Sequence, residues 1–493
     1  MTGGNIAAEF HAAAIDRLEA PFLLDGKRSW TYGEFFDHVR VFAAVLIDSG
    51  AQPGDRVLVQ VEKSPEAVAL YLACLWVGAV HVPLNPAFTA DERRYFIEDA
   101  EPAVIVVDPS MAEEQAWLTL DPDGGGSLTR RTVVAPVTEP VERGDDDLAA
   151  ILYTSGTTGW PKGATLTHEG LRANAHALHD TWHFTRDDHL IHGLPIFHVH
   201  GLFVALHCAL LSAIPITFLR HFDVDAVLDG FAEGTVFMGV PTHYARLCAS
   251  PRLTAERCAS MRLFTCGSAP LTEPAFAAFT DRTGHRICER YGMSETGITT
   301  SNPYDGDRIA GTVGYALPGV EARIVDTNGA EVAAGEVGVV AIRSRQVMRD
   351  YWRRPDATAD ACTDDGWFIT GDIATMATDG RITLQGRASD MIISGGENIY
   401  PKEIELVLDE IDGVVESAVI GVPDPDFGEQ VVAVLVCEGA PLGDADVRPA
   451  LDTALARFKH PRRIEVIDAL PRNAMGKVQK GVLRKRYASA EAG

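Results

Sequence analysis

Short apolar runs of strand length alternate with helical patterns along most of the chain, and this alternation limits the fold more than any other feature. Arg56–Val61 is typical of a strand, Ser64–Val77 of a helix and His81–Leu84 of a second short strand. A helix predicted at Thr89–Asp99 and a buried strand predicted at Ala103–Val107 repeat the order. Such alternation is typical of proteins in which helices cover an open, largely parallel sheet. We therefore predict an α/β fold.

Size and charge narrow the class further. A chain of 493 residues is too long for a single hydrophobic core, so we expect two or more domains. With 43 Lys and Arg against 69 Asp and Glu, the net charge of −26 argues against nucleic acid or an anionic membrane surface as a partner. The eight cysteines form no Cys-x-x-Cys pair, the N-terminal segment lacks a signal-peptide layout, and no apolar stretch reaches the length of a membrane span. We expect a cytoplasmic protein with free thiols and no zinc site; the sequence does not settle its oligomeric state.

Residues 153–164 read Tyr-Thr-Ser-Gly-Thr-Thr-Gly-Trp-Pro-Lys-Gly-Ala and directly follow the apolar run 149–152. A buried strand that opens into such a loop can present backbone N–H groups, hydroxyls and a cation to a polyphosphate. A solvent-exposed turn is the alternative for any short glycine-rich segment, but the length and order of the motif favour phosphate binding. The lysine precedes a glycine rather than Ser or Thr, so this is not the Walker A pattern of P-loop NTPases.

Three further groups carry the residue types of a nucleotide site. Residues 291–295, Tyr-Gly-Met-Ser-Glu, offer a ring to stack on a base and a carboxylate for Mg²⁺, although alone they could be a helix N-terminus with Ser294 as cap. Asp372 can accept ribose hydroxyls and Arg387 can bind a phosphate in fork geometry, although each alone is more often a turn aspartate or a solvated arginine. Lys477, preceded by a glycine, can enter a site as a mobile charge or remain solvated.

The pattern changes near residues 386–394, where we predict a domain boundary. Arg381–Gln385 alternates as a strand, whereas Ile392–Tyr400 is typical of a glycine-rich turn before a helix at Pro401–Ile411. The rest of the chain predicts a small α+β unit. Its expected elements are strands at Val414–Val422, Val431–Cys437 and Arg463–Ile467 and a helix at Asp444–Arg457. We place the two domains at 1–386 and 387–493.

Taken together, motifs 153–164, 291–295, 370–372, 386–387, 395–401 and 471–477, in this order and at these separations, resemble those of the adenylate-forming enzymes. That superfamily includes acyl-CoA synthetases, beetle-type luciferases and the adenylation domains of peptide synthetases. The resemblance covers nearly the whole chain. It implies a large N-terminal domain of two α/β subdomains plus a β-barrel, joined by a hinge near 387–390 to a small mobile α+β C-terminal domain. It also implies two half-reactions, in which a carboxylate attacks MgATP to give an acyl-adenylate and pyrophosphate, and a thiol then releases AMP.

The resemblance assigns roles residue by residue. Thr154 and Glu295 should hold Mg²⁺, Tyr291 should stack on adenine, and Lys477 should bridge the carboxylate and the α-phosphate, which makes Lys477, Glu295 and Thr154 the catalytic set. The implied ATP and AMP contacts are Thr154, Ser155, Gly156, Thr157, Thr158, Gly159, Lys162, Gly267, Ser268, Ala269, Tyr291, Gly292, Met293, Ser294, Asp372 and Arg387. The implied coenzyme A (CoA) side of the site is Gly395, Gly396, Glu397 and Asn398. One departure is Ser389, followed by Asp390, where the family's hinge usually carries Asp or Lys.

Within the superfamily, segments 194–202, 239–242, 267–271 and 289–293 look most like those of malonyl-CoA synthetases. Arg246 and Arg290, if beside the acyl pocket, would be costly for a fatty acid because a buried charge needs a partner. A second substrate carboxylate supplies that partner, with Ser268 and His198 as further contacts. We therefore expect malonate, with methylmalonate as a second candidate. If the arginines lie outside the pocket, a short-chain, medium-chain or aryl acyl-CoA synthetase remains open, as does an adenylation enzyme that loads a carrier protein.

Overall fold

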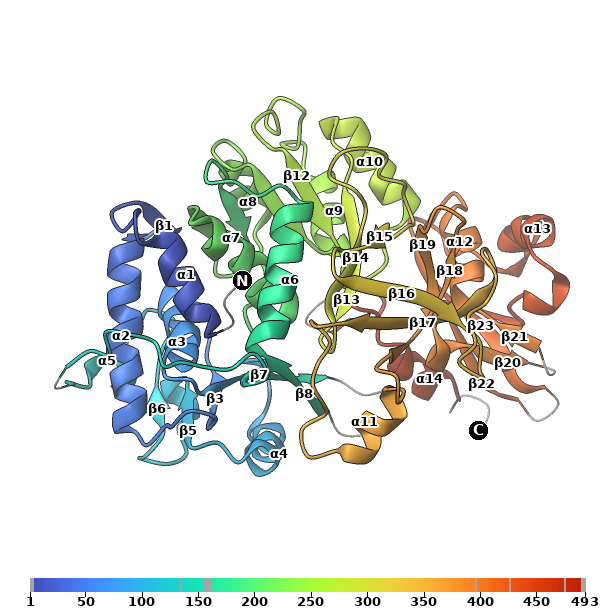
Figure 1. Ribbon diagram of the computed structural model, residues 1–493. Coiled ribbons are helices and arrows are strands. Elements are labelled where there is room, and N and C mark those ends of the chain that lie inside the picture. The colour runs from blue at the N-terminus through green and yellow to red at the C-terminus, as the bar shows by residue number, and fades with distance from the viewer. Residues whose placement is uncertain are drawn as a thin grey trace.

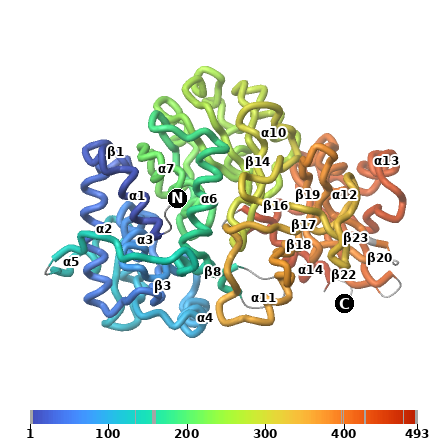
Figure 2. The backbone as a smooth tube through the Cα atoms, in the orientation of Figure 1, coloured from blue at the N-terminus to red at the C-terminus, as the bar shows by residue number. Residues whose placement is uncertain are grey.

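A computed structural model of the chain describes residues 4–133, 135–154, 161–394, 397–424, 427–473 and 476–488. Two mixed sheets with their helices form the N-terminal part, a four-stranded antiparallel sheet follows, and a small C-terminal unit lies at the far side (Figure 1). The predicted α/β class, with a large N-terminal part and a small C-terminal one, is confirmed. The backbone trace in Figure 2 shows the two mixed sheets with their helices side by side, and the C-terminal unit beyond the antiparallel sheet.

The first sheet holds the strands that the alternating pattern predicted. Neighbouring strands in this sheet run parallel, except β7 and β8, which form an antiparallel hairpin. In order across the sheet its strands are β6 (Leu118–Thr119), β5 (Val104–Val107), β3 (Arg56–Gln60), β4 (Val80–Pro83), β7 (Leu148–Thr154) and β8 (Lys162–Thr167).

The second sheet combines strands from two distant parts of the sequence. Two of its strands, β1 and β2, come from the start of the chain, before any strand of the first sheet. Strand β1 pairs in parallel with β10. In order across the sheet its strands are β15 (Tyr315–Ala316), β14 (Gly297–Ser301), β13 (Cys288–Met293), β12 (Leu263–Cys266), β11 (Val236–Gly239), β9 (Leu190–His192), β10 (Ile216–Phe218), β1 (Pro21–Leu24) and β2 (Ser29–Thr31). The core of β9 to β13 is parallel, so their carboxyl ends meet at one edge, where open α/β sheets place their ligands.

Helices pack around and between the two sheets (Figure 1). Their N-termini follow local capping rules: Thr31 forms a capping box with Glu34, and Ser64 caps the helix that begins at Pro65. That helix, α3, is buried on nearly every face, as its almost wholly apolar sequence requires. The N-terminal helices are α1 (Ile6–Ala14), α2 (Tyr32–Asp48), α3 (Pro65–Trp76), α4 (Ala90–Ala100), α5 (Ser127–Arg130), α6 (His168–Thr181), α7 (Leu206–Ser212), α8 (Val224–Gly230), α9 (Pro241–Ala249) and α10 (Glu273–Thr283), with a π-helix at His200–Ala205.

The antiparallel sheet follows the second sheet along the chain. It consists of β16 (Val320–Val325), β17 (Val337–Ser344), β18 (Phe368–Met376) and β19 (Ile382–Arg387), with α11 (Pro355–Ala361) before β18. Within the described residues, strand pairing leaves β16 and β19 at the two edges. Its closure into the expected barrel therefore stays a prediction.

In the residues that the structure describes, the C-terminal unit is a five-stranded sheet with three α-helices. Residues 392–400 were predicted to form a turn, but residues 392–394 and 397–399 form two paired strands. The first of these, β20, also pairs with β23 at Gly428, far along the chain. Its elements are β20 (Ile392–Ser394), β21 (Glu397–Ile399), α12 (Pro401–Asp409), β22 (Val414–Asp424), β23 (Gly428–Cys437), α13 (Asp444–Ala454), β24 (Arg463–Val466) and α14 (Lys480–Ala488). No helix in the described part of the chain is long and apolar enough to cross a membrane.

Candidate active site

The predicted phosphate loop joins the two strands of the β7–β8 hairpin. Thr154 and Lys162 are register partners at the end of the hairpin next to the loop, and the Thr154 hydroxyl donates to the Lys162 carbonyl at 3.4 Å. The Lys162 ammonium lies 4.7 Å from the ring centroid of Tyr351. The structure thus brings the first and last polar residues of the motif together. Ser155, Gly156, Thr157, Thr158 and Gly159 lie outside the described residues.

Glu295 lies at the tip of a second hairpin, not at a helix N-terminus. Residues 294–296 form a three-residue turn between β13 and β14, and Gly297 takes the left-handed conformation (φ +61°) that such turns require. The strands are so close that a side chain at Gly292 would overlap the Gly297 carbonyl. Although a hairpin tip is normally exposed, Glu295 is only 5% exposed. The Tyr351 hydroxyl donates to its Oε1 at 3.1 Å, so Tyr351 links Glu295 to Lys162.

Tyr291, Asp372 and Arg387 form one hydrogen-bonded group. Asp372 and Arg387 are register partners on β18 and β19, and the Arg387 Nε lies 3.1 Å from the Asp372 Oδ1. The Tyr291 hydroxyl donates to the other carboxylate oxygen at 2.6 Å. Burial, followed by the Asp372 charge, raises the pKa of Tyr291 well above its ordinary value, so its hydroxyl remains a donor. Three residues predicted from separate motifs therefore meet at one point.

Lys477 reaches this group from the C-terminal unit. Burial, with the Arg387 guanidinium next, lowers its pKa, while the Asp372 and Glu295 carboxylates oppose that effect. The preceding Gly476 has φ +75°, and a Cβ atom there would lie 3.1 Å from the Thr242 hydroxyl, at the start of α9. Backbone and side chain of Asn473 close the loop, because its N–H donates to the Lys477 carbonyl at 2.9 Å and its Oδ1 accepts from the Lys477 N–H at 3.0 Å. These two bonds fix the Lys477 backbone, and its buried ammonium interacts with the charged groups of the site.

Arg290 is a buried cation beside this group. It is 3% exposed, and within the described residues its Nε and Nη2 have no hydrogen-bond partner. Burial lowers its pKa to about 10, and the groups that oppose this effect are Cys266, Tyr244 and Cys288, none of them a carboxylate. Its guanidinium lies against Gly267, where a Cβ atom would come within 2.6 Å of its Cζ. Glycine at 267 therefore makes the space that the guanidinium fills.

Two histidines and a strained serine border Arg290. Burial, then the Lys477 and Arg290 charges, lowers the pKa of His198 to about 3, so it is neutral and can accept a hydrogen bond. Its Nδ1 accepts from the His200 N–H at 3.3 Å, and the Ser268 hydroxyl lies 3.4 Å from the His200 Nδ1. Ser268 has φ +72°, a conformation that non-glycine residues adopt rarely and that occurs preferentially at functional sites. His200 was not among the predicted site residues; its place follows from the π-helix that begins there, which the sequence pattern does not reveal.

The remaining predicted residues include one exposed arginine and several neighbours of the site residues above. Arg246 is exposed in the last turn of α9, 4.8 Å from the ring centroid of Phe222, and no contact among the described residues joins it to Arg290. Ala269 continues the Ser268 turn, and Met293 and Ser294 belong to the Glu295 hairpin. Glu397 is exposed in β21; Gly395, Gly396 and the Asn398 side chain lie outside the described residues.

A cavity on the C-terminal unit was not predicted. Its volume is about 310 Å³, and its lining is basic and aromatic. The lining residues are Arg448, Arg457, Phe458, His460, Pro461 and Arg462. The Phe458 side chain is 49% exposed. The basic lining is a local concentration of positive charge in a chain of net charge −26.

Comparison with known proteins gives the family. The AMP-binding enzyme family matches residues 10–352, and its C-terminal domain matches residues 403–477. ATP-bound MatB from Rhodopseudomonas palustris is 48% identical, with a TM-score of 0.93 over 98% of this chain and 99% of that one. The malonate–CoA ligase of Arabidopsis thaliana is 33% identical over 90% of this chain and 79% of its own length. The feruloyl-CoA synthase of an Amycolatopsis species is 35% identical over 94% and 95%.

The chain therefore belongs to the AMP-binding, adenylate-forming enzymes. Within that superfamily it is an AMP-forming acid–thiol ligase of the acyl-CoA synthetase family, with a malonyl-CoA synthetase-like sequence. The malonate–CoA ligase and the feruloyl-CoA synthase are 33% and 35% identical to this chain, so identity to these two relatives does not decide the acid.

Proposed function

We propose that the enzyme ligates malonate to CoA through a malonyl-adenylate, releasing pyrophosphate and then AMP. The observation that carries the choice of acid is the Arg290 guanidinium. A buried cation with unpaired nitrogens is costly, and a carboxylate able to accept from two of its N–H groups removes that cost. A monocarboxylic acid uses its only carboxylate in the reaction and leaves Arg290 unpaired. Malonate has a second carboxylate to spare, and methylmalonate differs from it by one methyl group.

In the first half-reaction the chain's contribution is positioning and charge. Lys477 supplies a cation that interacts with Arg290 as well as with Asp372 and Glu295. The acid and the α-phosphate would meet at this cation. Asp372 would exchange one of its present partners, Tyr291 or Arg387, for the ribose hydroxyls. Lys162 and the loop that follows Thr154 would hold the β- and γ-phosphates. Neutral His198 and Ser268 can orient the acid without adding charge.

Magnesium fits the residues present. Within the described residues no group of three or more His, Cys, Asp or Glu side chains could bind a metal by itself, so any ion here takes most of its ligands from phosphate and water. That is how Mg²⁺ is usually bound at nucleotide sites, and the Glu295 carboxylate and the Thr154 hydroxyl are the hard oxygen ligands it prefers. When bound, the ion would neutralise charge on the phosphates.

For the second half-reaction we propose that the C-terminal unit rotates about residues 387–390. Asp390 pairs with Arg484 of α14 at 2.8 Å, which places a charged contact one residue beyond the unusual Ser389. Two structures of the same relative support two arrangements, since the ATP-bound MatB matches this chain with a TM-score of 0.93 and the apo form with 0.83. The present arrangement, with Lys477 in the site, suits adenylation. The basic cavity around Phe458 would then bind the phosphates and adenine of CoA.

The experiment is a pyrophosphate-release assay with malonate, methylmalonate, succinate, acetate and benzoate, each with and without CoA. We expect malonate to give the highest kcat/KM. Dominance of a monocarboxylic acid would refute the assignment of Arg290 while leaving the family unchanged.

A further inference from the structure

Two buried amide side chains hold the hairpin tip that carries Glu295. The backbone of this tip lacks a neighbouring strand on one side, because pairing between β14 and β15 begins only at Thr300. The carbonyl oxygens of Thr296 and Ile298 would otherwise be buried without donors, which is costly. Asn174 of α6 and Gln346, which follows β17, supply those donors.

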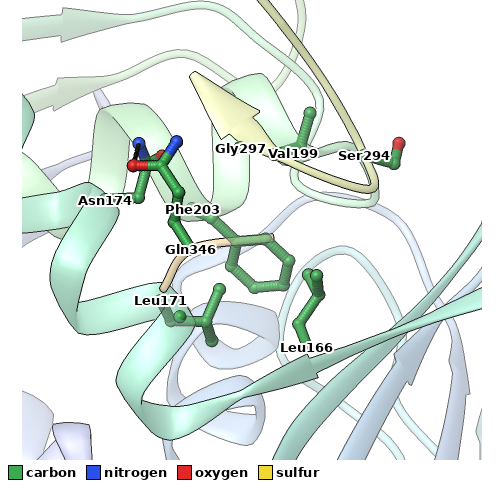
Figure 3. A pocket seen from close by; sticks show the side chains of 9 residues that line it. Leu166, Leu171, Asn174, Val199, Phe203, Ser294, Gly297 and Gln346 are labelled. Atoms are coloured by element: carbon green, nitrogen blue, oxygen red, sulfur yellow. Dashed lines mark hydrogen bonds between the residues drawn. The ribbon is translucent and has the colours of Figure 1, made fainter. Parts of the chain in front are cut away.

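The contacts form one network. The Asn174 Nδ2 donates to the Ile298 carbonyl at 2.8 Å, and its Oδ1 accepts from the Ile298 N–H at 3.2 Å. The Gln346 Nε2 donates to the carbonyls of Thr296 at 2.7 Å and of Ile298 at 2.5 Å. The Asn174 Nδ2 also reaches the Gln346 Oε1 at 3.3 Å. Figure 3 shows the two amide groups side by side, next to the strand that begins at Gly297.

Burial and close packing restrict both amides. Asn174 is 5% exposed and Gln346 is 3% exposed. A Cβ atom at Gly297 would lie 2.7 Å from the Asn174 Oδ1, so the turn and the amide are in close contact. Beside them is a cavity of about 10 Å³, lined by residues that include Phe203 and Ser294. This volume is about that of one water molecule.

We propose that Asn174 and Gln346 are positioning residues that fix the Glu295 carboxylate for the adenylation step. Neither contacts Glu295; they fix the backbone of residues 296–298 on one side of it, while the Met348 N–H bonds the Glu295 carbonyl at 2.6 Å and Tyr351 bonds its carboxylate. Loss of the amides would let the tip move and would shift Glu295 relative to the phosphates. The inference rests on the proposed role of Glu295 in holding MgATP. It adds two residues from distant segments to the determinants of that site.

The test uses near-isosteric variants that remove the hydrogen bonds but keep the volume, Asn174→Leu and Gln346→Met. ATP binding is measured by calorimetry at a series of Mg²⁺ concentrations without any acid, so the result does not depend on which acid is activated. We expect the Mg²⁺ concentration for half-maximal ATP binding to rise about 10- to 100-fold, the usual effect of losing a group that orients a metal ligand. Because the two amides share the Ile298 carbonyl, the double variant should lose less than the product of the single losses.

Asn5→Leu is the matched control. The Asn5 amide also donates two bonds, to the carbonyls of Leu75 and Val141, and accepts one from the Ala7 N–H, but it lies outside the site. This variant should lose thermal stability and keep the wild-type Mg²⁺ dependence. If Gln346→Met does not fold, Gln346→Glu keeps the side-chain shape while replacing the donor with a carboxylate oxygen, and the same rise is expected.

Glu295→Gln separates the possible failures. If it weakens Mg²⁺-dependent ATP binding while the folded Asn174→Leu and Gln346→Met variants match the wild type, the positioning role is refuted and the proposed function stands. If Glu295→Gln also matches the wild type, the role of Glu295 in holding MgATP is refuted, and the positioning proposal with it.

Discussion

Replacing Arg290 with methionine should make the enzyme more stable and less active on malonate at the same time. Burial lowers the pKa of Arg290 from 12.5 to about 10. At about 1.4 kcal/mol per pKa unit, the charged guanidinium costs the free enzyme roughly 3 kcal/mol at pH 7, where it is protonated in both the folded and the unfolded state. Methionine has a comparable length and no charge, so Arg290→Met should raise the free energy of unfolding by up to about 3 kcal/mol, reduced by any loss of packing.

The same substitution removes the partner of the second carboxylate. Loss of one side of a buried, hydrogen-bonded charge pair costs about 2–5 kcal/mol, which corresponds to a fall of about 30- to 5,000-fold in kcat/KM for malonate. Propionate, similar in size but with one carboxylate, should change by less than about 3-fold. Pyrophosphate release gives the activities, and urea unfolding gives the stability.

Arg172→Met is the control for the stability effect. Arg172 is as buried as Arg290, but it is paired with Asp145 and Glu169, so its loss should destabilise the fold and leave the ratio of malonate to propionate activity unchanged. The reasoning is refuted if Arg290→Met destabilises the protein as Arg172→Met does, or if it reduces both activities equally.

Three further predictions concern the C-terminal loop and the buried histidines. Lys477→Ala should abolish pyrophosphate release but retain thioester formation from supplied malonyl-adenylate and CoA; surviving adenylation would contradict its role. Gly476→Ala should slow adenylation at least 10-fold with little change in global stability. The reason is that a Cβ atom strains the left-handed backbone and also presses on Thr242. Wild-type rates would show that this contact is unimportant. Burial lowers the pKa of His81 and His207 to about 3, so the unfolded chain takes up protons first as the pH falls below about 6.5. The free energy of unfolding should therefore fall between about pH 6.5 and pH 3, by up to about 1.4 kcal/mol per pH unit for each imidazole. Urea unfolding at pH 7.5 and 5.5 measures this loss, and equal stability at the two values would contradict it.

Local pattern was sufficient for much of the fold. The β3, α3, β4, α4 and β5 elements were predicted within one or two residues because the strands are short apolar runs and each helix begins at a side-chain cap. What local pattern cannot give is pairing between distant segments. The placement of β1 beside β10 and of β20 beside β23 depends on contacts far along the chain, which is why residues 392–399 were predicted as a turn.

Some residues of the site could be predicted from the sequence and others could not. Glu295, Asp372, Arg387 and Lys477 were candidates as charged residues in glycine-containing motifs, but their roles came from the resemblance of the whole motif set to the adenylate-forming enzymes. The structure brings these four residues within electrostatic reach of one another. Tyr351 and the two amides in the preceding subsection gave no such signal. An asparagine within a helix or a glutamine after a strand reads as a surface residue, and its role is visible only once the fold buries it against another element.

The most direct test of the account is a competition experiment. The enzyme is given ATP, Mg²⁺, CoA and an equimolar mixture of malonate, acetate, benzoate and ferulate, and the CoA esters formed at low conversion are identified by mass spectrometry. The account predicts malonyl-CoA as the main ester, with one AMP formed per ester, and loss of that preference in Arg290→Met. A main product derived from any of the monocarboxylic acids would contradict it.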